Sequence, residues 1–148
     1  MRTLRLVLLA ALVLALAGCG GHKVHVWGEV SYDGKPVASG TIEFVPVDGT
    51  RGPSTGGMIV DGRYDVPAKV GPLPGGVYQV EIRAMRPTGE TMPDPMNPNG
   101  PPIERKENYI PDVYNTRTTL KVTISSSSAE NQHDFRLEKR ALDSDKEG

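Results

Sequence analysis

Apolar and polar residues alternate along most of this chain, and this two-residue period restricts its fold more than any other feature. Val24, Val26 and Val30 fall on one side of an extended backbone, whereas Trp27 falls on the other. Successive side chains of a half-buried β-strand point to opposite faces in this way. The segment 22–32 is therefore predicted to be a strand.

The same period recurs in six later segments. Strands are predicted over residues 41–47, 58–60, 63–66, 77–83, 118–124 and 133–137. Asp33-Gly34 and Asp61-Gly62 stand between strands, and such pairs form tight turns because both residues tolerate a positive φ. Beyond the N-terminal segment, no window keeps a helical spacing of apolar residues for more than a turn or two. The domain is therefore predicted to be all-β, with about seven strands packed as a sandwich so that no apolar face stays in water.

The N-terminus has the pattern of an export signal. Arg2 and Arg5 precede an unbroken apolar run over residues 6–16. As a helix this run would rise only about 16 Å, which is too short to cross a bilayer. Residues 1–18 are therefore predicted to be a signal peptide.

Leu16-Ala17-Gly18-Cys19 follows directly and resembles the lipobox of bacterial lipoproteins. The resemblance implies cleavage between Gly18 and Cys19 and attachment of lipid, including palmitate-type acyl chains, to the Cys19 thiol. Residues 19–23 would then be a lipidated tether, and Gly20 favours the outer over the inner membrane. An ordinary secreted protein is the alternative, and with a single cysteine no intramolecular disulfide forms in either case.

Removal of the signal peptide leaves 130 residues, enough for one domain, with 15 basic and 18 acidic side chains. The basic residues are scattered, and no basic stripe with interleaved aromatic residues follows a strand. Nucleic acid is therefore not an expected partner.

The segment 85–108 contains six prolines and no apolar period, so it is predicted to be a long surface loop without ladder strands. Long loops of this kind are often functional. Met85, Met92 and Met96 would give it adaptable apolar contacts for a partner. Residues 138–148 are expected to form a polar tail.

One set of motifs resembles a known family. It comprises Gly28-x-Val30-x-Tyr32-Asp33-Gly34-Lys35-Pro36, Gly40-Thr41-Ile42-x-Phe44, Gly75-x-Val77-Tyr78-x-Val80 and Ile110-Pro111-x-x-Tyr114-Asn115. The pattern is similar to carboxypeptidase regulatory-like, or transthyretin-like, domains in lipoproteins of planctomycete-type bacteria. It implies a single Ig-like Greek-key sandwich over residues 24–137. Independently of the family, Gly40 is expected at a bulge or a close backbone crossing, and the Tyr78 hydroxyl is expected to cap a backbone group.

Residues suited to catalysis or metal binding are sparse. A strand would separate His22 from His25, and His133 lies far along the chain, so neither a metal nor any other cofactor is expected. A weaker possibility is calcium at the acidic residues that border the Pro-rich segment: Asp94, Glu104, Glu107 and Asp112.

The expected function is therefore that of a membrane-anchored, non-enzymatic interaction or structural module of the cell envelope, with a protein or glycan partner. A small transthyretin-like hydrolase is one alternative. It would use His25 or His133 beside one of three arginines: Arg63, Arg83 or Arg117. The chain ends in Asp145-Lys146-Glu147-Gly148 rather than in the Tyr-Arg-Gly-Ser of hydroxyisourate hydrolases. A carbohydrate-binding adhesion module is a further alternative, with Trp27 as its aromatic platform unless that ring packs inside.

Overall fold

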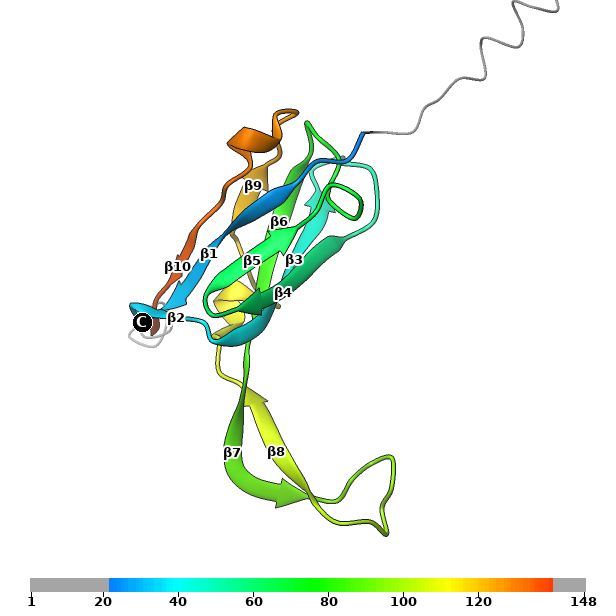
Figure 1. Cartoon of the computed structure of the whole chain (residues 1–148), viewed down its shortest axis with the longest axis vertical. Helices are drawn as coiled ribbons and strands as arrows, with labels where there is room; N and C mark the ends of the chain where they lie inside the picture. The colour runs from blue at the N-terminus through cyan, green and yellow to red at the C-terminus, as the bar shows by residue number, and fades with distance from the viewer. Residues whose placement is uncertain (1–21, 140–148) are drawn as a thin grey trace, which may run out of the picture.

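A computed structural model describes residues 22–139, and within this range the chain forms ten strands, two short 3-10 helices and no α-helix (Figure 1). The strands are β1 (Val26–Tyr32), β2 (Lys35–Pro36), β3 (Ser39–Val47), β4 (Thr55–Val60), β5 (Arg63–Val66), β6 (Val77–Arg83), β7 (Met85–Met92), β8 (Ile103–Asn108), β9 (Lys121–Thr123) and β10 (Phe135–Leu137). The 3-10 helices are η1 (Asp112–Tyr114) and η2 (Ser128–Glu130). The prediction of an all-β domain is confirmed. The predicted signal peptide, Cys19, the first part of the tether and the tail from residue 140 lie outside the described residues.

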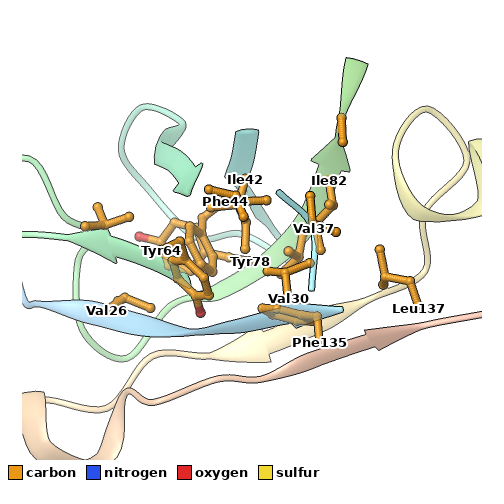
Figure 2. Packing of buried hydrophobic residues seen from close by; sticks show 14 of the residues in the cluster. Val26, Val30, Val37, Ile42, Phe44, Tyr64, Tyr78, Ile82, Phe135 and Leu137 are labelled. Atoms are coloured by element: carbon orange, nitrogen blue, oxygen red, sulfur yellow. The ribbon is translucent and has the colours of Figure 1, made fainter. Parts of the chain in front are cut away.

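Eight strands belong to one sheet that curls around the core (Figure 1). Its hydrogen-bonded order is β10-β1-β5-β4-β3-β6-β9, and β2 pairs with β1. The β1–β10 pair is parallel, whereas the other strand pairs of the sheet are antiparallel. Curling brings distant strands face to face: Val30 of β1 points into the core from one side, and Ile42 and Phe44 of β3 lie on the other side (Figure 2).

Most of the core consists of alternate residues of these strands, and the segments beside the strands add Val24, Val37, Ala84, Ile110 and Ile124. It contains Val24, Val26, Val30, Val37, Ile42, Phe44, Ile59, Tyr64, Val66, Tyr78, Val80, Ile82, Ala84, Ile110, Ile124, Phe135 and Leu137. In β6, Tyr78, Val80 and Ile82 are buried and their neighbours are only half-buried, as the alternation predicts. Burial of these side chains is the main driving force for folding.

The turn predictions are confirmed by the backbone angles. Asp33 and Gly34 have φ of 51° and 76°, and Asp61 and Gly62 have φ of 49° and 77°. Two successive positive values define the type I′ turn, whose twist matches that of paired strands.

Two predicted structural roles are also confirmed. A Cβ on Gly40 would lie 2.5 Å from the carbonyl oxygen of Arg83, so the two backbones cross closely there. The Tyr78 hydroxyl accepts a 2.9 Å hydrogen bond from the backbone N–H of Leu73. Gly40 therefore permits this close approach, and Tyr78 ties the loop before β6 to the core.

The prediction of a strandless loop over residues 85–108 is wrong. β7 and β8 pair antiparallel with each other and form a hairpin separate from the main sheet. Five of the six prolines lie in the connection 93–102, where they interrupt no ladder. Pro87 lies in β7 itself, but a two-stranded hairpin has a free edge on each strand, and the pairing shifts register just after this proline. Gly89 supplies a φ of 79° within the irregular stretch.

Polar contacts hold the base of the hairpin to the core. Asn108 Oδ1 accepts hydrogen bonds from the backbone N–H groups of Ala84 (3.1 Å) and Ile110 (3.2 Å). The N–H of Tyr109 donates to the carbonyl of Ala84 at 3.0 Å. Beside them, the buried Asn115 donates to the carbonyls of Ile110 and Pro111, which return the chain from the hairpin into η1.

Candidate binding surfaces

The β7–β8 hairpin projects from one end of the molecule (Figure 1). The first described residues, which lead into β1, lie at the opposite end of the long axis (Figure 1). Exposed apolar side chains are concentrated along the hairpin and at its tip: Met85, Met92, Met96 and Ile103. Met96 is 93% exposed. The three methionines that the sequence selected are therefore all exposed on one projecting element.

The tip of the hairpin is ordered by local hydrogen bonds. Asp94 Oδ1 accepts from the N–H of Met96 at 2.8 Å, and the Asp94 carbonyl accepts from the N–H of Asn97 at 3.1 Å. The Asn97 carbonyl in turn accepts from Gly100 at 2.9 Å. Two successive turns thus present the Met96 side chain to solvent.

The shaft of the hairpin is polar. Arg86 pairs with Glu107 at 2.7 Å, and Arg105 pairs with Glu90 at 2.9 Å. Exposed ion pairs of this kind contribute little stability. Their effect is to keep the shaft hydrated, so that the apolar contact area is confined to the tip and the Met85 end.

A second surface lies on the outer face of β1, β5 and β4, where there is an open groove of about 760 Å³. We call it the Trp27 groove, and it is lined by Trp27, Gly28, Glu29, Met58, Val60, Arg63, Tyr64, Asp65 and Gln132. Met58 and Val60 are 60% and 59% exposed. Trp27 and Arg63 were candidate site residues from the sequence, whereas the other lining residues were not. The run Met58-Ile59-Val60 is a sequence signal for Met58 and Val60, because three successive apolar residues place apolar side chains on both faces of a strand.

Strand register determines how the polar side chains surround the Trp27 indole. Trp27 of β1 is the register partner of Asp65 of β5, and Glu29 is the partner of Arg63. The His25 ring stacks on the indole at a centroid distance of 4.7 Å and an interplanar angle of 21°. Its Nε2 lies 3.1 Å from Asp65 Oδ2. Trp27 is therefore half-exposed on the outer face and is not the packed centre of a second layer.

The loop before β10 fixes the backbone of Trp27. The Trp27 N–H donates to the Asn131 carbonyl at 3.2 Å, and the Trp27 carbonyl accepts from the His133 N–H at 2.9 Å. Asn131 is fully buried and exchanges two hydrogen bonds with the backbone of Ser125. These contacts place Gln132 at the wall of the groove.

The histidines occupy different environments. His22 is exposed, and His25 is in the stack described above. His133 Nε2 is buried, and no group within residues 22–139 forms a hydrogen bond with it. Burial lowers the pKa of His133, although the neighbouring Asp134 carboxylate opposes this shift. Burial also raises the pKa of Tyr64, whose hydroxyl donates to the His133 carbonyl.

The three arginines considered for a hydrolase each lie within 4.0 Å of a carboxylate: Arg63 with Glu29, Arg83 with Glu81 and Arg117 with Asp112. Arg63 lines the Trp27 groove, whose lining residues include neither His25 nor His133.

The acidic residues that border the hairpin are spread along it. Asp94 lies at the tip, and Glu104 and Glu107 lie in β8, whereas Asp112 begins η1. Within the described range, no group of three or more His, Cys, Asp or Glu side chains is arranged to hold a metal ion. No helix in the same range has the length and apolar character needed to cross a membrane.

No protein-family model matches the chain, and no curated protein matches it. Among solved structures, the chain is similar to a 9R-lipoxygenase from Cyanothece PCC8801, with 15% sequence identity and a TM-score of 0.34. The match covers 83% of this chain and 17% of the lipoxygenase chain. A TM-score this low does not show a shared fold, and lipoxygenase activity is not carried over to this chain.

Proposed function

We propose that this protein is a lipid-anchored, non-enzymatic interaction module of the cell envelope, held at a membrane through Cys19 and binding a partner with its β7–β8 hairpin. The observation that carries the proposal is the position of the hairpin at the end opposite to the start of the described chain (Figure 1). On this proposal the domain is a carboxypeptidase regulatory-like Greek-key sandwich, and the outer membrane is the favoured location.

The proposed tether is short, and its length determines which end of the domain would lie near the membrane. Four residues lie between Cys19 and the buried Val24, and the five residue steps that join them span at most about 18 Å when extended. A lipid on Cys19 would therefore keep that end of the domain close to the bilayer surface. The hairpin then points away from the membrane and reaches partners in the surrounding compartment.

The composition of the hairpin suits protein recognition. Methionine side chains adapt to the shape of a partner, and the exposed Met92, Met96 and Ile103 lie at or near the tip. Prolines in the connection 93–102 restrict the unbound chain, which lowers the conformational entropy lost on binding. An envelope protein with a shallow apolar pocket is the partner that this surface fits.

The anchor is tested by expressing the full chain and its Cys19→Ser variant in a bacterial host with lipoprotein processing. We expect the unaltered protein in the membrane fraction, with a mass that shows cleavage before Cys19 and attached acyl chains. We expect the variant to have a mass without attached acyl chains. Recovery of an unprocessed chain or of an acyl-free mature Cys19 would contradict the proposal.

The hairpin is tested with a photoreactive methionine analogue placed at position 96 of the anchored protein in native envelopes. We expect a defined cross-linked protein, and we expect it to disappear when Met92 and Ile103 are both replaced by serine. The same probe at position 58, on the sheet face, is the control and should not capture that protein. Equal cross-linking from both positions would mean that the hairpin is not the binding element.

A further inference from the structure

We propose that the Trp27 groove is a second, separate binding site, and that its ligand is a chain of pyranose sugars without acidic substituents. The proposal does not depend on the hairpin or on the lipid anchor. It rests on the combination of apolar and hydrogen-bonding side chains that line the groove.

The apolar part of the groove matches the face of a sugar ring. The Trp27 indole, Met58 and Val60 line the groove together, and the last two are more than half exposed. One face of a pyranose presents C–H groups, which pack on an aromatic ring and on methyl groups with release of water. The groove is lined by Trp27 but not by His25, so the stacked histidine leaves the indole surface toward the groove free.

The polar part matches the hydroxyl groups at the edge of the ring. A sugar hydroxyl both donates and accepts, so it needs donors and acceptors close together. Arg63 and Gln132 supply donors, and the carboxylates of Glu29 and Asp65 supply acceptors. The side chains of Arg63, Glu29 and Asp65 are 79%, 65% and 69% exposed, so they are available to a ligand. Hydrogen bonds to charged groups are also stronger than those between neutral groups.

The charge of the groove selects among sugars. The lining of the groove includes two carboxylates, Glu29 and Asp65, and one guanidinium, Arg63, so these lining side chains are net negative. Sulfated sugars and uronic acids would be repelled, whereas neutral sugars and sugars bearing an amine are compatible. A protonated amine would in addition be attracted to the Trp27 ring.

The groove is also built on a fixed backbone. Trp27 lies opposite Asp65 of β5 on one side, and on the other side its N–H and carbonyl form the hydrogen bonds with Asn131 and His133 described above. Its volume of about 760 Å³ lies within the range of about 300 to 1,000 Å³ that is usual for ligand sites. Little reorganisation is therefore needed to receive a short saccharide.

Trp27 is the only tryptophan of the chain, so its fluorescence reports directly on this groove. The purified protein, expressed from the full chain and kept in a detergent without a sugar headgroup, is titrated with hexasaccharides of glucose, mannose, N-acetylglucosamine and glucosamine. A hexasaccharide of galacturonic acid is the acidic comparison. We expect a saturable change in emission with at least one of the first four and none with the acidic one.

Variants separate the groove from the hairpin. By calorimetry, Trp27→Ala should abolish binding, and Arg63→Gln, at an exposed position that folding does not need, should weaken it by about fivefold or more. Met96→Ser, in the hairpin, should leave saccharide binding unchanged while it weakens capture of the partner protein. The proposal is overturned if none of the four sugars binds at millimolar concentration, if the acidic sugar binds best, or if Trp27→Ala and Arg63→Gln bind as the unaltered protein does.

Discussion

The backbone carbonyl of His133 lies against the α-carbon of Gly28, so closely that a Cβ at position 28 would be 1.9 Å from its oxygen. This contact lets the segment before β10 approach β1 and form the parallel pair that begins at Val30 and Phe135. The glycine is therefore required by the packing of two backbones, although its own φ is not in the left-handed region.

Gly28→Ala should accordingly lower the free energy of unfolding by about 2 to 4 kcal/mol, because the clash is with backbone and cannot be relieved by a side-chain rotation. Denaturant titration measures the loss. Gly57→Ala is the matched control, since its Cβ would lie 3.2 Å from the Val66 side chain and 3.3 Å from the Asp65 carbonyl oxygen, which is much less tight than the 1.9 Å at position 28. If both variants lose the same stability, the Gly28 contact is not a special constraint.

Tyr64→Phe tests the other interaction of the same carbonyl. The Tyr64 hydroxyl, on a side chain that is 3% exposed, donates to the His133 oxygen at 2.8 Å. Its removal should cost about 1 to 2 kcal/mol, because the carbonyl loses a buried partner. Tyr109→Phe is the comparison, since within the described residues no hydrogen bond to the Tyr109 hydroxyl is found. Thermal unfolding of the two variants should differ clearly, and equal melting temperatures would contradict the expectation.

His133 should make stability depend on pH. Burial lowers the pKa of His133 in the folded state, whereas the pKa of a histidine in the unfolded chain is about 6.5. At a pH between these two pKa values the unfolded state binds more protons than the folded state. The contribution of neutral His133 is complete above about pH 6.5 and is lost as the pH falls toward the folded-state pKa. The free energy of unfolding should therefore fall more steeply between about pH 7 and pH 5 in the unaltered protein than in His133→Phe. His22→Gln, at an exposed position, should behave as the unaltered protein, and an unchanged slope in His133→Phe would refute the assignment.

The alternating strands and their turns were predictable because local physics determines them. In β1 and β6 one face is buried and the other is not, so the apolar period appears directly in the sequence. Asp33-Gly34 and Asp61-Gly62 have positive φ at both residues. Few other residue pairs adopt these angles without strain, so the two pairs mark turns in the sequence.

The edges of the sheet were less predictable. The segment 118–124 contributes only the short β9, and 133–137 only β10. At an edge a strand ends where its partner ends, and the register with β1 and β6 is not encoded in the local pattern. The short length of both strands also leaves little unpaired edge.

The hairpin and the Trp27 groove depend on long-range relationships. β7 and β8 bury no face, so they have no apolar period, and cross-strand pairs such as Arg86–Glu107 join residues far apart in the sequence. The groove combines residues from three strands and a loop, and Gln132 joins it only because the chain returns beside Trp27. Sequence reasoning identified Trp27 and the three methionines but not their neighbours.

The buried Asn115 gives a structural role to the motif Ile110-Pro111-x-x-Tyr114-Asn115, for which the sequence alone indicated none. The residue is 2% exposed, its Nδ2 donates to the carbonyls of Ile110 and Pro111, and its Oδ1 accepts from the Thr116 N–H. Asn115→Leu should lower the free energy of unfolding by about 2 to 4 kcal/mol, because several buried backbone groups lose their partner together. Asn99→Leu, at the exposed tip of the hairpin, is the control and should change stability by less than about 0.5 kcal/mol. Denaturant unfolding of both variants measures the two changes in the free energy of unfolding, and equal changes would contradict the prediction.

The last prediction is that the main sheet is stable without the β7–β8 hairpin. Replacing residues 86–107 by an Asn-Gly turn between Met85 and Asn108 removes a hairpin whose strands pair only with each other, and it keeps the contacts of Asn108 with Ala84 and Ile110. An isolated two-stranded hairpin is marginally stable by itself, so the free energy of unfolding should change by no more than about 1 kcal/mol.

Asn108→Ala in the intact chain is the informative comparison, because it leaves the hairpin in place but deprives two backbone N–H groups of their acceptor. We expect this single substitution to cost about 1 to 2 kcal/mol, more than the removal of the hairpin itself. Denaturant titration with a spectroscopic readout of the core measures both. The reverse order would mean that β7 and β8 stabilise the sheet, and a hairpin needed for folding would not be free to act as an independent binding element.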